Sequence, residues 1–461
     1  MAEKCMVPTN GMVIRSNTRL EPGVYILPDG LTIDADNVTL DGNGATLIGV
    51  DRKGAGVTVR NHAGVTIRNV RLREYAHGIV ARQCQKLTVE ANHVTSTAEV
   101  DTYSLFLTIG RQSDDPYGGG ILLDHVDDSQ IVDNDVQHQM NGLLTYHCNR
   151  LSVLRNLASY NSGFGIHLHH TCDSLFEGNW ADYCCRWEPR DKSADKPRGV
   201  TGQGCVGHMG ADAAGFVIVE ASCRNVFRRN AARLGGDGFF LAGGVRKGEN
   251  LGCNDNLFEF NDGSLSPNIA FEATFSRGNI FRNNWADRCN FGFWLGCSEA
   301  YVLEGNRMLY NRQAGIAADH AANFQVRGND FQSNGHGILT WTTYNEGLHG
   351  TTGDQFVSRG WTIEGNKFYK NDFGIAIRAD RDHGIRPVAP EISGKAQMRP
   401  HDHVIRDNDI QDNRVGIQLF CADRTIIERN KINKNVEADI RAEDDRETKL
   451  GHNLGMRGAY L

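Results

Sequence analysis

A short strand signal that opens with Gly recurs along the chain and limits the folds open to it. The stretch from Gly165 to His170, GIHLHH, is one copy. The copies begin at Gly78, Gly120, Gly142, Gly165, Gly215, Gly238, Asn268, Gly292, Gly315, Gly337, Gly374 and Gly416. One copy cannot bury its apolar face alone, so the chain must stack equivalent strands on one another.

A second signal is an Asn that closes a short alternating strand. It occurs at Asn43, Asn69, Asn92, Asn134, Asn156, Asn179, Asn230, Asn261, Asn284, Asn306, Asn329, Asn366, Asn408 and Asn430, and many of the gaps are 22 or 23 residues. Asn tolerates the left-handed backbone conformation of a tight bend, and stacked Asn side chains can hydrogen-bond to each other. We predict that each Asn occupies such a bend and bonds from coil to coil.

A period of this length with two strand signals fits one coil of a parallel β-helix. It is too short for helix-pair or propeller repeats and lacks the Leu spacing of leucine-rich repeats. From about residue 30 to 440, the pattern resembles the right-handed parallel β-helix repeats of the pectate-lyase-like superfamily. The resemblance implies an all-β, single right-handed parallel β-helix solenoid of about 13–14 coils. We expect an irregular N-terminal cap over residues 1–36, the β-helix over 37–436 and a C-terminal cap or tail over 437–461.

The resemblance leaves the activity open, because the superfamily includes polysaccharide lyases, glycoside hydrolases, uronan epimerases and phage tailspikes. The short catalytic signatures of the known subfamilies are not found: the sequence lacks the polygalacturonase combination of paired-Asp and HG motifs and the DPH motif of alginate epimerases, which the run from Arg399 to Asp402 only echoes. A carbohydrate partner is therefore expected, without a defined subfamily.

Charge and cysteine usage restrict the partners and the compartment. The net charge is -7, from 49 basic and 56 acidic residues spread along the chain, so neither a nucleic-acid footprint nor a polybasic membrane patch is expected. The amino terminus has no apolar core of a secretory signal, which favours a cytoplasmic protein. The 12 cysteines include matched repeat positions such as Cys184 and Cys289, which favours buried thiols over a disulfide framework.

Five coils are longer than the period, and their extra residues must leave the stack as loops. Such loops on a rigid scaffold commonly carry function. The insertions at 97–117 and 187–210 precede the Gly-initiated strand of their coil, whereas those at 244–253, 342–358 and 380–402 follow it. We therefore predict a groove whose floor is the row of Gly-initiated strands.

Strand alternation indicates which floor residues point into the groove. With Gly as position zero, positions one and three are mostly apolar and point inward, so positions two and four point outward. Position four reads Arg82, Asp124, Tyr146, His169, Val219, Ala242, Glu272, Gly296, Asp319, Trp341, Arg378 and Phe420, and position two includes His167, Phe240 and Trp294. Arg82 and Arg378 are far from the centre of this row and are expected at the surface.

Paired carboxylates would allow glycoside hydrolysis, which uses two of them about 5–9.5 Å apart. Glu220 at a strand end and Glu272 two coils later form one candidate pair, and Asp212 and Asp237, before neighbouring strands, form the other. All four are predicted catalytic residues. Asp beside Gly is also ordinary turn chemistry, so a structural role stays open for Asp212 and Asp237.

The histidines offer proton-transfer chemistry. His167 and His169 point outward, with Tyr146 and His147 one coil earlier, so these side chains should converge. We predict catalysis by His169 and substrate binding by Tyr146, His147 and His167, with a structural cluster as the alternative. Tyr146 and His169 would also suit a lyase or epimerase that removes the proton next to a uronate carboxylate. No metal is predicted here, because HxHH supplies only two ligands on one face.

Two indoles complete the predicted substrate site. Trp294 and Trp341 could stack on sugars, and Asp319 is a further predicted binding residue. The floor has no Lys to neutralise a uronate, and although calcium on Asp124 or Asp319 could replace one, no cofactor is predicted. The sequence thus favours a glycoside hydrolase, with a uronate lyase or C5-epimerase second and a non-catalytic glycan- or protein-binding β-helix third.

Overall fold

The computed structural model describes residues 5–101, 104, 107–186, 213–246, 249–342, 357–379, 399–456 and 459–460. All regular elements in these ranges are β-strands, as predicted. The chain divides into two compact units, Met1–Phe240 and Leu241–Leu461, which are described separately. The described residues contain no helix able to cross a membrane.

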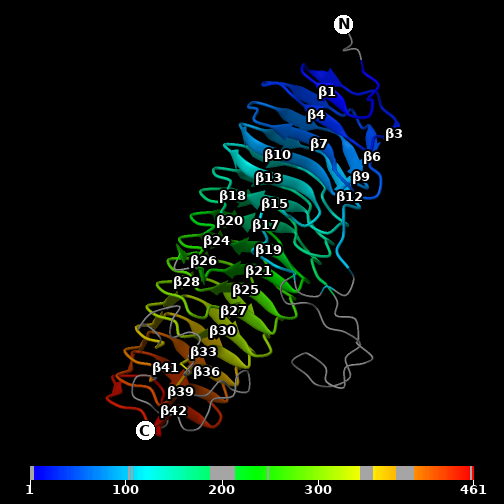
Figure 1. Ribbon diagram of the computed structural model, residues 1–461. Helices are drawn as coiled ribbons and strands as arrows, with labels where there is room; N and C mark the ends of the chain where they lie inside the picture. The colour runs from blue at the N-terminus through cyan, green and yellow to red at the C-terminus, as the bar shows by residue number, and fades with distance from the viewer. Residues whose placement is uncertain are drawn as a thin grey trace. The chain divides into compact units, whose positions relative to one another are not determined.

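Three parallel sheets build unit 1 (Figure 1). The Gly-initiated strands form the first sheet: β1 (Met12–Ile14), β4 (Leu31–Ile33), β7 (Ala55–Arg60), β10 (His77–Gln85), β13 (Gly119–Asp127), β15 (Leu143–Tyr146), β17 (Ile166–His169), β19 (Ala214–Val219) and β21 (Asp237–Ala242), the last of which runs past the unit boundary. The second sheet contains β2 (Thr18–Arg19), β5 (Thr39–Asp41), β8 (Thr66–Arg68), β11 (Thr88–Glu90), β14 (Gln130–Val132), β16 (Ser152–Leu154), β18 (Leu175–Glu177) and β20 (Val226–Arg228). The third contains β3 (Val24–Ile26), β6 (Thr46–Ile48), β9 (Arg71–Arg73) and β12 (His93–Thr95).

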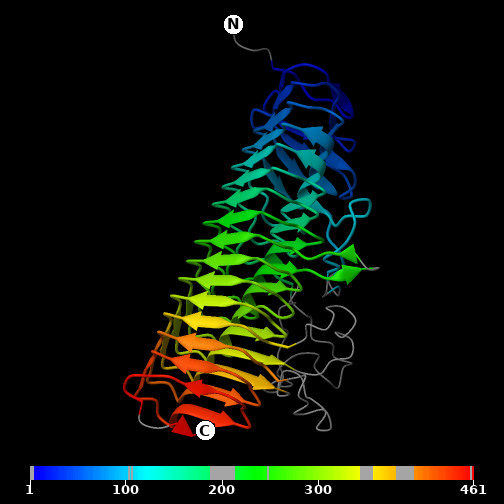
Figure 2. The same ribbon diagram turned by 90° about the vertical axis from the view of Figure 1, so that its left-hand side faces the viewer.

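Unit 2 repeats this plan, and within each of its main sheets the arrows point the same way (Figure 2). The sheet that corresponds to the Gly-initiated sheet of unit 1 contains β25 (Ile269–Thr274), β27 (Phe291–Trp294), β30 (Ala314–Asp319), β33 (His336–Thr342), β36 (Phe373–Ala379), β39 (Val415–Phe420), β42 (Ala438–Glu443) and β44 (Ala459–Tyr460). The second sheet has β24 (Leu257–Glu259), β26 (Ile280–Arg282), β28 (Val302–Glu304), β31 (Gln325–Arg327), β34 (Thr362–Glu364), β37 (Val404–Arg406), β40 (Ile426–Glu428) and β43 (Lys449–Leu450). The third has β29 (Arg307–Leu309), β32 (Asp330–Gln332), β35 (Lys367–Tyr369), β38 (Asp409–Gln411) and β41 (Lys431–Asn433), and β22 (Val245–Arg246) pairs with β23 (Glu249–Asn250) in an antiparallel hairpin.

The predicted Asn ladder is present in both units. In unit 1, the Nδ2 of Asn134 donates to the Oδ1 of Asn156 at 2.9 Å, and that of Asn156 donates to the Oδ1 of Asn179 at 3.0 Å. The same oxygens also accept backbone N–H groups of the preceding coil, as when Asn134 N donates to Asn156 Oδ1 at 3.0 Å. The side chains are buried, so the ladder satisfies polar groups inside the coils that water cannot reach.

The backbone role predicted for most of these Asn residues is wrong. Among those of the buried ladder, the left-handed conformation belongs to the preceding residue, for example Asp133 with φ of 55°, Arg155 with 53° and Arg229 with 52°. Only Asn43 and Asn69 of the predicted set are left-handed themselves. The ladder explains the difference, because an Asn that bonds to the coils on either side must point inward, and the bend falls one residue earlier.

Both chain ends contribute strands where caps were expected. β1 pairs in parallel with β4, and β4 with β7, so residues before 37 already belong to the Gly-initiated sheet. At the other end, β42 and β43 lie after residue 436 and pair with β39 and β40. The stack therefore begins earlier and continues later than the sequence pattern indicated.

Candidate functional site

A row of polar side chains crosses the Gly-initiated sheet of unit 1 at position four. Strand register pairs Arg82 with Asp124, Asp124 with Tyr146, Tyr146 with His169 and His169 with Val219. This order is the one predicted from alternation. In Figure 1 the strands that carry the row, β10, β13, β15, β17 and β19, follow one another from blue through cyan to green.

The 97–117 insertion covers this row rather than standing beside it. Its segment Leu107–Tyr117, which we name the strap, makes three polar contacts with side chains at positions two and four. The Nε2 of His167 donates to the Ile109 carbonyl at 2.8 Å, Gln112 Nε2 lies 3.2 Å from His169 Nε2, and an Arg82 nitrogen donates to the Ser113 carbonyl at 2.9 Å. The predicted open groove is therefore closed at this point.

Tyr146, His167 and His169 form one buried group beneath the strap. The Tyr146 ring centroid lies 5.2 Å from that of His169 and 5.7 Å from that of His167. Tyr146 is 1% exposed and His169 is 0% exposed. Tyr146 also packs with Leu144 of its own strand and with Leu122 of the preceding coil, both at position two. The structure thus brings together three of the four residues predicted to converge, and the ring centroid of the fourth, His147, lies 5.7 Å from that of His169.

Burial sets opposite proton preferences for the phenol and the imidazoles. It raises the pKa of Tyr146 well above its usual range, against a smaller opposing effect of Arg111. Burial, with the neighbouring imidazoles of His167, His170 and His147, lowers the pKa of His169 to about 3. Tyr146 is therefore protonated and His169 neutral near pH 7.

His167 adds an unused hydrogen-bonding position to this group. Because its Nε2 donates to the Ile109 carbonyl, its Nδ1 is the acceptor in the neutral ring. That Nδ1 is buried and has no hydrogen-bond partner among the described residues. Burial also lowers the pKa of His167 to about 4, so the ring stays neutral at physiological pH.

Acidification should destabilise the fold through His167. An unfolded His binds a proton below about pH 6.5, whereas folded His167 does so only near pH 4, so its stabilising contribution is complete above about pH 6.5 and is lost as pH falls toward 4. Between pH 7 and pH 4.5 the parent should lose about 2 kcal/mol more unfolding free energy than His167→Gln. Urea unfolding at both pH values measures this difference.

The matched control is His125→Gln, which removes an exposed imidazole from the same sheet. His125 lies at position five of its coil, and its side chain is 59% exposed. Its substitution should leave the loss on acidification equal to that of the parent. An equal loss in His167→Gln would show that His167 is not the group responsible.

Histidines also line the corner after the strands, at position five. His125, His147 and His170 are all left-handed, with φ of 54°, 52° and 50°, and their rings stack with centroid separations of 4.8 Å. Donor atoms of His147, His169 and His170 lie within 4.8 Å of one another, as do those of Cys297, Asp319 and His320 in unit 2. In the first group, the His169 and His170 Nδ1 atoms are 3.1 Å apart and share a hydrogen bond.

The guanidinium groups of Arg82 and Arg111 are near enough to Tyr146 to oppose the rise of its pKa, although the floor positions carry no Lys. Arg82 is half-buried and forms an ion pair with Asp124, so it does not lie at the open surface as expected. Arg111 of the strap lies 4.3 Å above the Tyr117 ring and pairs with Asp115, whose side chain is 77% exposed. Sequence reasoning missed Arg111 because it lies in an insertion, outside the repeat that allowed the floor residues to be compared.

Neither predicted carboxylate pair lies wholly within the described part of unit 1. Asp212 lies outside the described residues, and Glu272, the predicted partner of Glu220, belongs to unit 2. Asp237 begins β21 and is fully buried, at the level of Ala214 on β19, whereas Glu220 follows Ala214 by six residues at the corner. Six residues of strand span about 20 Å, which exceeds the separation of paired catalytic carboxylates.

The fourth carboxylate, Glu272, belongs to unit 2 and occupies position two, not the predicted position four. Its register partner is Trp294, which stands at position two of its own strand. The error arose from treating Asn268 as the equivalent of Gly. The register instead makes Ala270 that equivalent, because Phe271 pairs with Phe293.

The other predicted binding residues of unit 2 form a largely apolar cluster. Trp294 and Trp341 make an edge-to-face contact at 5.6 Å, and the cluster also contains Ile269, Phe291, Ala314, Ala317, Leu339 and Ala376. The expectation that Trp341 exposes its indole is wrong, since it is 1% exposed, while Trp294 is half-buried. Asp319 is buried and accepts a hydrogen bond from His320 at 3.0 Å.

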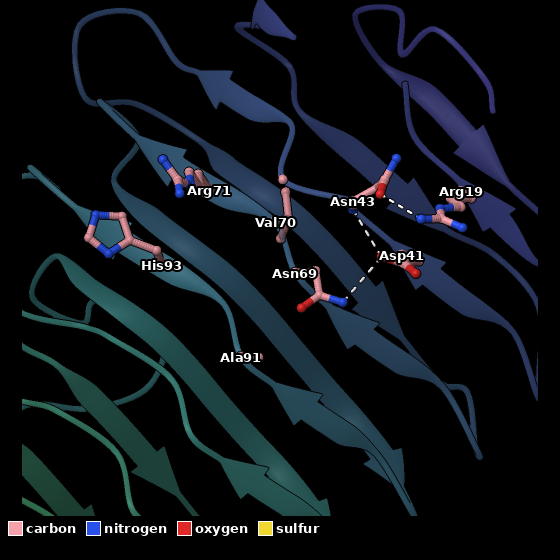
Figure 3. A pocket seen from close by; sticks show the side chains of 9 residues that line it. Arg19, Asp41, Asn43, Asn69, Val70, Arg71, Ala91 and His93 are labelled. Atoms are coloured by element: carbon pink, nitrogen blue, oxygen red, sulfur yellow. Dashed lines mark hydrogen bonds between the residues drawn. The ribbon is translucent and has the colours of Figure 1, made fainter. Parts of the chain in front are cut away.

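A shallow pocket in unit 1 contains none of the predicted residues. It is lined by Arg19, Asp41, Asn43, Gly44, Asn69, Val70, Arg71, Ala91 and His93 (Figure 3). Its polar groups bond to one another, since Arg19 donates to Asn43 Oδ1 at 2.7 Å and Asn69 donates to Asp41 Oδ1 at 3.3 Å. The pocket therefore offers few unsatisfied groups to a ligand.

Comparison with known proteins places the fold in a family. The model of the right-handed β-helix region matches residues 21–201 and 198–352. No curated protein matches the sequence.

Similar solved structures include polysaccharide enzymes at low identity. The Azotobacter vinelandii mannuronan C-5 epimerase AlgE6 A-module is 15% identical, with a TM-score of 0.44 over 79% of this chain and 85% of that chain. The periplasmic alginate epimerase AlgG is 12% identical, with a TM-score of 0.39 over 93% and 78%. An alginate lyase from Paenibacillus sp. str. FPU-7 is 12% identical, with a TM-score of 0.32 over 69% and 85%. Since the family model spans more than half of the sequence, this chain belongs to the right-handed β-helix family.

Proposed function

We propose that this protein is a carbohydrate-active enzyme that acts on a uronate polysaccharide, as a lyase or a C5-epimerase, with Tyr146 and His169 at the reacting carbon. The observation that carries the proposal is the pairing of these two side chains on adjacent coils, 5.2 Å apart and beside the guanidinium groups of Arg82 and Arg111. Proton removal next to a carboxylate needs a base, an acid and a neutralising cation, and unit 1 supplies all three.

Both reactions begin with transfer of the C5 proton of the sugar to the neutral imidazole of His169. In a lyase, the electron pair left on C5 forms the C4–C5 double bond, the C4–O4 bond breaks, and the Tyr146 phenol gives its proton to the leaving O4. In an epimerase, the Tyr146 phenol instead gives its proton to C5 on the face opposite to His169, and the C4–O4 bond stays intact. The unpaired Nδ1 of His167 can accept a hydrogen bond from a sugar hydroxyl in either case.

Arg111 is suited to hold the uronate carboxylate. Its present partner, Asp115, contacts it through two nitrogens at 3.1 and 2.6 Å and is largely exposed to solvent. Both nitrogens donate to the same oxygen, Asp115 Oδ2, and a substrate carboxylate can take the place of Asp115 and accept from both nitrogens. The positive charge of Arg111 would offset the negative charge that develops at C5.

Access to Tyr146 and His169 requires the strap to move. Its polar contacts over these residues are those that His167, His169 and Arg82 make with Ile109, Gln112 and Ser113. A neutral hydrogen bond contributes only about 1 kcal/mol net and one from a charged group such as Arg82 about 1.5–3 kcal/mol, so a bound polymer that replaces these contacts can open the strap. Closure around the sugar would then exclude water from the reacting carbon.

A panel of uronate homopolymers in deuterated buffer tests the proposal. Ultraviolet absorbance of an unsaturated uronate identifies a lyase, and deuterium incorporation at C5 without chain cleavage, measured by NMR, identifies an epimerase. New reducing ends without unsaturation would instead indicate the hydrolase favoured by the sequence and would overturn the proposal. Binding of a polymer without any of these products would instead indicate a non-catalytic, glycan-binding β-helix.

A further inference from the structure

Two half-buried cysteines of unit 1 face each other at the same turn of adjacent coils. Cys172 precedes β18 by three residues and Cys223 precedes β20 by three residues, and Leu175 and Val226 at the strand starts are register partners. The backbone N–H of Cys223 donates to the Cys172 sulfur at 3.3 Å. Adjacent coils place Cα atoms about 4.8 Å apart, within the range of about 4.4–6.8 Å that a disulfide spans.

The Cys172 sulfur occupies a position that anionic oxygen occupies elsewhere in the same row. Asn149, one coil before Cys172, donates its backbone N–H to the carboxylate of Asp127 at 2.9 Å. Cys172 takes the role of that carboxylate toward Cys223. The backbone N–H at this turn thus donates to the carboxylate oxygen of Asp127 at one place in the row and to the sulfur of Cys172 at another.

The surroundings of Cys172 favour its thiolate. The Cys223 thiol and backbone donate to the Cys172 sulfur, and Arg224 lies nearby, which together lower the pKa of Cys172 to about 6. By contrast, burial raises the pKa of Cys84, Cys148, Cys184, Cys185 and Cys289. Six of the eleven described cysteines are buried, whereas Cys172 is half-buried.

We propose that Cys172 and Cys223 are a redox-active dithiol that exchanges with small-molecule disulfides, with Cys172 as the nucleophile and Cys223 as the resolving thiol. The Cys172 thiolate attacks one sulfur of the small disulfide, whose S–S bond breaks and releases one thiolate that takes up a proton. Cys223 then loses its proton and attacks the Cys172 sulfur, which releases the second small thiol. The protein dithiol is oxidised to a disulfide, and the small disulfide is reduced to two thiols.

Glutathione disulfide is the probe that tests this assignment on the full-length protein at pH 7. Intact mass should show the loss of two hydrogens, peptide mapping should find the Cys172–Cys223 link, and dithiothreitol should restore the mass. Cys223→Ser should stop with one glutathionyl group on Cys172. Cys172→Ser should react at Cys223 at least ~10-fold more slowly, since the variant has lost the sulfur whose thiolate the Cys223 backbone N–H and Arg224 favour.

The half-buried thiol of Cys185 is an internal control within the same unit, and it should remain unmodified while Cys172 reacts. Wild-type protein without the Cys172–Cys223 link would overturn the proposal, as would equal rates of glutathionylation in the two single variants. The dithiol does not depend on the proposed lyase or epimerase activity, because neither cysteine belongs to that site.

Discussion

Replacing His169 with Gln should lower kcat/KM on the responsive uronate polymer by at least ~100-fold, because a positioned general base contributes about 10²–10⁴ to the rate. Gln fills a similar volume and keeps a hydrogen-bonding group toward Gln112, but it cannot carry the C5 proton. Tyr146→Phe should have an effect of similar size by removing the proton donor, while its ring keeps the packing with Leu122 and Leu144. Steady-state kinetics of product formation measures both.

The pH profile distinguishes His169 from an ordinary surface histidine. Since the pKa of His169 is lowered to about 3, the base stays unprotonated as pH falls, and kcat/KM should hold from pH 8 to about pH 5. A free imidazole would give an acid limb near pH 6.5. Circular dichroism at each pH separates loss of activity from loss of fold.

Matched controls come from another corner of the same coils. His138 and Tyr160 stack at 5.0 Å and lie outside the proposed site, and Tyr160 is exposed. His138→Gln and Tyr160→Phe repeat the same chemical changes and should leave kcat/KM unchanged. Full activity in both His169→Gln and Tyr146→Phe would remove these residues from the mechanism.

Replacing Asn156 with Ala should lower the free energy of unfolding by about 3–5 kcal/mol, because several buried groups lose partners at once. Its Oδ1 accepts from the backbone and side chain of Asn134, and its Nδ2 donates to Ile131 O and Asn179 Oδ1. An unsatisfied buried donor costs about 1–3 kcal/mol, and the Ala methyl satisfies none of them. Urea unfolding measures the difference.

Arg155→Ala is the matched control, since it changes the neighbouring residue of the same bend. Arg155 pairs with Asp133 at 2.8 Å, but both side chains are more than half exposed. Exposed ion pairs contribute at most about 1 kcal/mol, so this variant should unfold close to the parent. A loss under about 1 kcal/mol in Asn156→Ala would mean that water or a backbone shift replaces the ladder bonds.

The architecture could be predicted because each coil repeats the same sequence pattern and must bury its apolar face against the next coil. Gly at the start of β15 and β17 fixed the register, and alternation then placed Tyr146 and His169 on one face. At β25 no Gly marks position zero, and the alternation was misplaced by two residues at Glu272. The local pattern determines a strand, but only pairing with the next coil determines which residue starts it.

Features outside the repeat could not be placed in the same way. Arg111 and Gln112 lie in the strap, where no neighbouring coil provides an equivalent residue, and their contacts depend on how an insertion folds back. The cysteine pair shows the complementary case. Cys172 and Cys223 are 51 residues apart in sequence and became neighbours only because the intervening insertion lies within a single coil.

The register of the polar row also sets a length scale for anything that lies along it. From Arg82 through Asp124 and Tyr146 to His169, each coil advances by about 4.8 Å and changes the chemical group offered, from guanidinium to carboxylate, phenol and imidazole. A linear polymer whose own repeat differs from this step drifts out of phase as it extends. Under the proposed function, the number of sugars that the row can bind together is therefore limited by how closely the spacing of the monomers matches the spacing of the coils.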